Sequence, residues 1–214
     1  MNDDWGQQTG GAQQVAQIRQ ATTRAGAFPL QENSADAAVL ATLPPGLYTA
    51  QAVLAANSTV PSGVVLIEVY DVTQGGGTGP KASNVSTRGA VGTGNNILIA
   101  GFVLNGASSR RMLIRGAGPS LTRLGVPGVL ADPQLRLIDQ TSGAVLKLND
   151  DWASGPDAAI IASAANAAGA FPFANGSKDS AMIIMLQPGT YTVQLSGVNN
   201  GTGVGIVEVY DVDP

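Results

Sequence analysis

The sequence predicts an all-β protein: a jelly-roll-like β-sandwich with a short helical insert, present as one complete unit plus a half unit. Composition is the first reason: the chain has 214 residues, of which 44% are hydrophobic, only 12% are charged and 28 are glycine. Such a profile is typical of β proteins with many glycine turns. The second reason is a series of short apolar runs separated by turn residues, and the third is an internal repeat.

The repeat links two parts of the chain, which we call the first repeat segment (residues 2–72) and the second repeat segment (residues 149–212). The spacing of equivalent motifs shortens along the repeat, so the first segment has the longer loops, as expected of one folding unit present twice. The shared motifs are NDDW at 2–5 and 149–152, GAFP at 26–29 and 169–172, PG-x-YT at 45–49 and 188–192, and EVYDV at 68–72 and 208–212.

The repeat also predicts the domain organisation. Residues 84–148, which we call the front half, occur once and lead directly into the second repeat segment. Residues 85–214 are therefore expected to form a complete β-sandwich, and residues 1–72 only the C-terminal half of one. The Gly-rich stretch 73–84 is expected to be a linker.

Each element follows from local patterns. In the first repeat segment we expect a helix at 12–25 and strands at 36–43, 47–55 and 63–72. In the front half, apolar runs at 96–104 and 110–117 predict one hairpin, and runs at 134–139 and 144–150 predict another. In the second repeat segment, Pro156 and Gly169 bound a predicted helix, and strands are expected at 180–186, 190–196 and 205–212.

Five oxygen-bearing residues near the second predicted hairpin are candidate calcium ligands: Asp132, Asp139, Asn149, Asp150 and Asp151. Calcium prefers several carboxylate and amide oxygens held on loops. The same residue types also cap helices and stabilise turns, and no EF-hand spacing is present. Both interpretations stay open: a structural calcium site, with no other cofactor expected, or turn chemistry alone.

Two lysines are candidates for an intramolecular or intersubunit amide crosslink. Lys147 lies in a predicted strand beside carboxylates, and Lys81 lies in the linker. A desolvated lysine has a lowered pKa and becomes nucleophilic, so an amide bond to a neighbouring Asp or Asn would replace the disulfides that a chain without cysteine lacks. The alternative is an ordinary solvated lysine on the outer face of a strand.

Two further features have a functional and a structural interpretation. Trp5 and Trp152 occupy equivalent repeat positions and could stack on a sugar, but a core role beside the helix is favoured. The segment 115–125, RGAGPSLTRLG, superficially resembles a phosphate loop. It lacks the Lys-Ser/Thr ending of that motif, so a structural turn is expected.

Composition excludes several classes of function. There is no histidine, so a Ser-His-Asp triad cannot form, and we expect no enzyme. The net charge of −4 and the lack of a basic stripe argue against binding to nucleic acid. No apolar run is long enough to span a bilayer, so membrane insertion is not expected.

The motifs resemble two bacterial families. Residues 132–212, with DPQLRLIDQTSGAVLKLNDDW followed by QPGTYTVQLSG and VEVYDV, resemble pre-peptidase C-terminal domains, and residues 2–72 share the later part of this pattern. Residues 85–212 as a whole look like the repeat unit of large secreted bacterial β-proteins. The resemblance implies a jelly-roll-like sandwich, secretion and, in some members, calcium held by acidic turns. It implies no catalysis.

Together these patterns favour an extracellular or cell-surface structural protein. A half sandwich leaves strand edges unsatisfied, so residues 1–72 are expected either to belong to a longer tandem array or to be completed by another molecule of the same protein. We expect head-to-tail self-assembly by β-strand complementation, giving a filament with copies of itself as partners. The alternative is a calcium- or carbohydrate-binding adhesion module of a secreted multidomain protein, with glycans as partners.

Overall fold

The structure is a computed structural model that describes residues 1–55, 58–59, 65–72 and 82–213. It contains two compact units, Met1–Ala82 and Ser83–Pro214. Residues 73–81, most of the predicted linker, lie outside the described residues.

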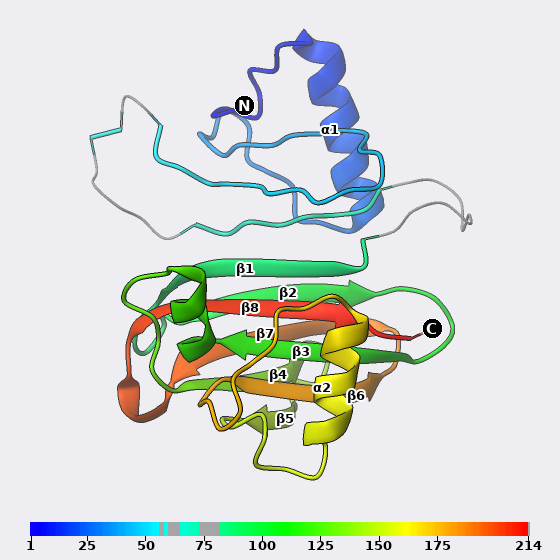
Figure 1. Cartoon of the computed structure of the whole chain (residues 1–214). Coiled ribbons are helices and arrows are strands. Elements are labelled where there is room, and N and C mark those ends of the chain that lie inside the picture. Colours follow the sequence, from blue (N-terminus) through cyan, green and yellow to red (C-terminus); the bar gives the residue numbers. More distant parts are fainter. Residues whose placement is uncertain (56–57, 60–64, 73–81, 214) are drawn as a thin grey trace. The chain divides into compact units, whose positions relative to one another are not determined.

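The second unit is a β-sandwich of two four-stranded antiparallel sheets, as predicted (Figure 1). In spatial order, the first sheet contains β1 (Asn84–Val91), β8 (Gly203–Asp211), β3 (Arg110–Ala117) and β6 (Ser180–Leu186). The second contains β2 (Leu98–Leu104), β7 (Gly189–Gly197), β4 (Pro133–Asp139) and β5 (Val145–Asn149). Two 3₁₀ turns, η1 (Pro119–Leu124) and η2 (Val198–Asn200), follow β3 and β7.

The main core lies between the two sheets, where alternate residues of each strand point inward. Ile114, Leu135, Val193 and Val207 are fully buried there. A second cluster lies on the opposite face of the first sheet, where α2 (Ala158–Ala167) packs through Ile161 on neighbours that include Leu113 and Tyr210. Because β3 is covered on both faces, its side chains are buried without alternation from Met112 to Ala117.

The structure corrects two predictions about the front half. The predicted hairpin of 96–104 with 110–117 is wrong, because β2 pairs with β7 while β3 pairs with β6 and β8 in the other sheet. The loop between β2 and β3 crosses from one sheet to the other, and two apolar runs flanking a turn do not reveal such a crossing. Strand β1 was not predicted. The hairpin of β4 with β5 is confirmed.

The first unit contains α1 (Gly11–Ala25), which ends at Gly26 in the left-handed conformation with φ 68°. Ile18 and Ala21 of this helix are buried, and so is Trp5, which precedes it in the chain. Strands were predicted at 36–43, 47–55 and 63–72, and this prediction is wrong for the described residues of the first unit, none of which lies in a strand. Residues 63 and 64 lie outside the described residues. A strand exists only when its backbone groups pair with a neighbour, and residues 1–72 contain no copy of the front half that supplies such neighbours in the second unit.

In the described part of the chain, neither helix is long and apolar enough to cross a bilayer.

Candidate functional site

In the second unit, the second repeat segment holds the end of β3 through a buried ion pair. Arg115 lies opposite Glu208 in the ladder of β3 with β8, and the guanidinium Nη1 is 3.3 Å from the carboxylate Oε2. The two side chains are only 1% and 8% exposed. The Tyr210 hydroxyl donates a hydrogen bond of 3.0 Å to Oε1 of Glu208. Burial raises the pKa of Glu208, and the Arg115 charge opposes that rise.

Two aromatic rings complete the environment of Arg115. Its guanidinium carbon lies 4.5 Å from the ring centroid of Phe171 and 4.1 Å from that of Phe173. Nη2 also donates a hydrogen bond of 2.6 Å to the Phe171 carbonyl. The cation is therefore held by a carboxylate, a carbonyl and two π faces in a region without solvent.

A second carboxylate holds the turn that follows β3. Asp179 is fully buried and accepts hydrogen bonds from the backbone N–H of Gly118 at 2.8 Å and of Ser120 at 3.2 Å, and from the Ser120 hydroxyl. Gly118 must lack a side chain, because a Cβ there would lie 2.1 Å from the Leu130 carbonyl oxygen. Glu208 and Asp179 thus bind the two ends of residues 115–120.

The first unit contains the equivalents of these binding residues. By the repeat, Glu68 corresponds to Glu208, Asp36 to Asp179 and Phe28 to Phe171. All three are exposed in the first unit, Phe28 by 54%. In the second unit Glu208 and Asp179 are buried and Phe171 is partly buried.

Local hydrogen bonds of the repeat are nevertheless the same in both units. The Trp5 N–H donates to the Asp36 carbonyl at 2.7 Å, and the Trp152 N–H donates to the Asp179 carbonyl at 2.9 Å. Two further pairs match. The Ala38 N–H donates to Asn2 Oδ1 at 3.0 Å, as the Ala181 N–H donates to Asn149 Oδ1 at 2.9 Å. The Tyr70 hydroxyl donates to Glu68 Oε1 at 2.9 Å, as the Tyr210 hydroxyl donates to Glu208 Oε1 at 3.0 Å. The first unit therefore has the same local hydrogen bonds as the second repeat segment.

Apolar side chains show the same contrast. Val39 is 71% exposed while its equivalent Met182 is fully buried, and Tyr48 is 54% exposed while Tyr191 is 4% exposed. Val69, equivalent to the buried Val209, is 62% exposed. We call Phe28, Asp36, Val39, Tyr48, Glu68 and Val69 the exposed repeat residues.

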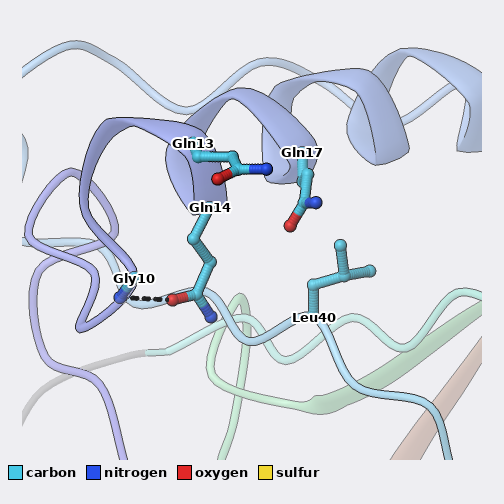
Figure 2. A pocket seen from close by; sticks show the side chains of 5 residues that line it. All are labelled: Gly10, Gln13, Gln14, Gln17 and Leu40. Carbon is cyan, nitrogen blue, oxygen red and sulfur yellow. Dashed lines mark hydrogen bonds between the residues drawn. The ribbon is translucent and has the colours of Figure 1, made fainter.

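A hollow of about 340 Å³ in the first unit corresponds to the place of a front-half side chain in the second. Figure 2 shows Gln13, Gln14 and Gln17 of α1 facing Leu40 across this hollow, with the Gln14 side chain bonded to the Gly10 N–H. By the repeat, Gln14 and Leu40 correspond to Asp157 and Ile183. Those two residues bind the Lys147 ammonium in the second unit.

The structure places Lys147 in a part-exposed ion pair. Its Nζ is 3.0 Å from Asp157 Oδ2 and 3.0 Å from the Ile183 carbonyl, and the two charged side chains are 32% and 40% exposed. The carboxylate beside Lys147 is therefore Asp157 rather than one of residues 149–151. The amide crosslink stays a prediction, and Lys81 lies outside the described residues.

The five predicted calcium ligands do not gather at one place. Asp139 and Asp132 lie at opposite ends of the seven-residue strand β4, roughly 20 Å apart along an extended chain. Backbone N–H groups of Ser142 and Thr141 bond to the Asp139 carboxylate and lower its pKa, as in a turn.

The other four predicted ligands are near one end of the β4–β5 hairpin. Lys178 Nζ lies 3.0 Å from Asp151 Oδ2 and 4.0 Å from Asp132 Oδ2. The Asn149 amide donates to the Asp151 carbonyl and accepts from the Ala181 N–H, and Asp150 adds to the attraction that Asp151 and Asp132 exert on the Lys178 ammonium. Among the described residues, no group of three or more Asp, Glu, His or Cys is arranged to hold a metal ion. Structural calcium stays a prediction.

The tryptophans are structural. Trp5 is 3% exposed and its indole donates to the Gln31 carbonyl at 2.9 Å, while Trp152 packs edge-on against Phe173. A polar hollow of about 530 Å³ on the second unit, lined by residues that include Arg136 and Gln194, contains no aromatic side chain on which a sugar could stack.

Sequence reasoning missed the residues that hold Arg115 and Ser120. The turn predicted at 115–125 is confirmed for Pro119–Leu124, which form η1, while residues 115–117 belong to β3. The partners Asp179 and Glu208 were not identified. A signal was present: Asp36 and Glu68 show that both carboxylates recur in the repeat, in a chain where charged residues are scarce.

No protein-family model matches the chain, and no curated protein is significantly similar to it. Among solved structures, the chain is similar to the pre-peptidase C-terminal domain of a collagenase from Bacillus anthracis. The match has 15% identity and a TM-score of 0.35, and covers 59% of this chain and 88% of that one. No conclusion follows from a likeness of this degree.

Proposed function

We propose that this chain is an extracellular structural protein that self-assembles head-to-tail through β-strand complementation into a filament. Residues 1–72 are the acceptor, and the occupant is the front half, residues 84–148, of another molecule. The role is non-catalytic. The motif resemblance to secreted bacterial β-proteins supports the extracellular location.

The observation that carries the proposal is the exposure of side chains that are core residues in the second unit. Val39, Tyr48 and Val69 are each more than half exposed, whereas their equivalents are at most 6% exposed. Burying one such side chain contributes about 1.5–3 kcal/mol. An incoming front half would bury all of them and would supply the missing hydrogen-bonding strands.

The number of halves determines how assembly proceeds. Residues 1–214 contain two copies of the back-half motifs and one front half. A front half that enters a second molecule must therefore leave its own back half, and the number of filled back halves does not change. Exchange therefore brings no net gain in burial over the closed molecule, and it is slow from the folded state because the second unit must open first. It also competes with closure within the same molecule, which has an effective concentration on the order of millimolar.

The test is refolding at two concentrations. We expect protein unfolded in denaturant and refolded at high concentration to form chains of molecules, seen by sedimentation velocity and negative-stain electron microscopy. Refolding at low concentration should give monomers. Monomers alone under both conditions would refute the proposal.

A matched pair of variants checks the surface involved. Val69→Asp should prevent assembly, because it puts a charge on a side chain that becomes buried, while the second unit stays folded. Ile160→Asp, at a position 52% exposed on α2, introduces the same charge outside the acceptor and should leave assembly unchanged. Equal assembly by both variants would exclude residues 1–72 as the acceptor.

A further inference from the structure

The complete unit shows which part of a front half is bound by buried carboxylates. Of the front-half segments, residues 115–120 meet the two buried carboxylates of the second repeat segment, Glu208 and Asp179. Strands β1 and β2 meet that segment through backbone ladders. Backbone ladders accept almost any strand, whereas a buried ion pair selects a particular side chain in a particular register.

The first unit presents the same two carboxylates to solvent. Glu68 is oriented by the Tyr70 hydroxyl in the way that Tyr210 orients Glu208. The backbone of Asp36 is fixed by Trp5, and the Asp36 carboxylate accepts a hydrogen bond of 2.7 Å from Ser34. Phe28 follows the left-handed Gly26 just as Phe171 follows Gly169, with φ 68° and 70° at the two glycines.

We infer that Glu68, Asp36 and Phe28 form a recognition site for residues 110–121 of a second molecule. Glu68 binds the Arg115 guanidinium, Phe28 supplies its ring face and carbonyl, and Asp36 accepts hydrogen bonds from Gly118 and Ser120. The inference rests on the proposed function, and it names the segment and the contacts that set the register of the donated strand.

Charge and shape favour this occupant over an unrelated strand. Residues 110–121 carry three arginines and no acidic residue, while the acceptor site presents two carboxylates. Gly116 and Gly118 let the segment approach closely, since a Cβ at Gly116 would lie 2.6 Å from the Ser180 hydroxyl. An unrelated apolar strand would leave Glu68 and Asp36 buried without partners, which is costly.

The test uses the full chain and a labelled synthetic peptide of residues 109–124 in fluorescence anisotropy. We expect saturable binding. Glu68→Gln in the chain or Arg115→Gln in the peptide should each weaken binding about 10- to 100-fold. The two changes together should weaken it no more than either alone, because both remove the same ion pair.

Matched controls separate this contact from general charge attraction. Arg111→Gln removes the same charge from the peptide at a position exposed in β3, and Glu32→Gln removes the same charge from the chain at an exposed residue. Each should change the affinity less than about threefold, because exposed charges are screened. If these controls weaken binding as much as Glu68→Gln does, the inference is wrong.

The outcomes also separate the inference from the proposed function. If molecules assemble on refolding but Glu68→Gln leaves peptide binding unchanged, the recognition site is refuted and assembly by other strands stands. If the peptide binds as expected but refolded molecules stay monomeric, the site stands and filament assembly is refuted. If neither the peptide nor a longer probe of residues 84–148 binds the full chain, the inference is refuted.

Discussion

Replacing Asp179 tests whether its buried carboxylate holds the turn that follows β3 in the complete unit. Its carboxylate is fully buried and accepts hydrogen bonds from two backbone N–H groups and one hydroxyl, those of Gly118 and Ser120. Asp179→Ala removes the acceptor oxygens of all three hydrogen bonds at once. Because this site is fully buried, water cannot replace them without local opening of the structure.

The expected cost follows from those bonds. Leaving a buried donor without a partner costs about 1–3 kcal/mol per group, so two N–H groups and a hydroxyl that can rotate toward another acceptor predict a loss of about 3–5 kcal/mol. The equivalent Asp36→Ala in the first unit provides the matched control. Asp36 is exposed, and its replacement in monomeric protein should change stability by less than about 1 kcal/mol.

Urea unfolding followed by far-UV circular dichroism measures both effects, because β1–β8 of the second unit give the sheet signal and α1 contributes a helix signal from the first unit. An Asp179→Ala variant that loses less than about 1 kcal/mol would refute the argument that this carboxylate holds residues 118–120. A large loss in Asp36→Ala would show that the first unit buries this carboxylate within the monomer.

Three further predictions follow. Gly118→Ala should cost about 3 kcal/mol or more in urea unfolding, because its Cβ would meet the Leu130 carbonyl, while Gly155→Ala, with open space around it, should cost almost nothing. Burial raises the pKa of Tyr210 to about 12, so its stabilising contribution should be fully present below the unfolded-state pKa of about 10 and be lost as pH rises from there through 12. Tyr210→Phe should remove one phenolate from the high-pH ultraviolet titration, and an unchanged titration would contradict this. Calcium should leave the melting temperature unchanged, because the Lys178 ammonium already lies beside two acidic groups; a calcium-dependent rise would instead support the predicted metal site.

Much of the second unit could be predicted from local patterns. The β4–β5 hairpin, α2 and the three strands of the second repeat segment lie where apolar runs, Pro156 and Gly169 indicate them. The pairing of β2 with β7 and of β3 with β6 and β8 could not be predicted, because sheet membership depends on partners far away in the sequence. Strand β1 was missed because NVSTRGAV contains few apolar residues, and its side chains are largely exposed on an edge strand.

The candidate site was predictable only in part. The shared motifs relate residues 1–72 to the second repeat segment, in which Asp36 and Glu68 recur as Asp179 and Glu208. The tertiary structure was needed to identify Arg115 and Ser120 as their partners, since contacts of these residues join positions more than fifty apart in the sequence. The grouping of Asp139 with Asp132 failed for the converse reason: both flank β4, but an extended strand places its two ends far apart.

The sequence by itself determined the composition of a β-sandwich, the repeat and the local hydrogen bonds of each repeat segment, because these depend on residues close together in the chain. Only the tertiary structure decided which of the two segments forms strands. The shared motifs lie in buried strands where a front half pairs with them, whereas in the described part of residues 1–72 they are exposed and outside any strand. The reason is that a β-strand is stable only when a neighbour satisfies its backbone and covers its apolar face.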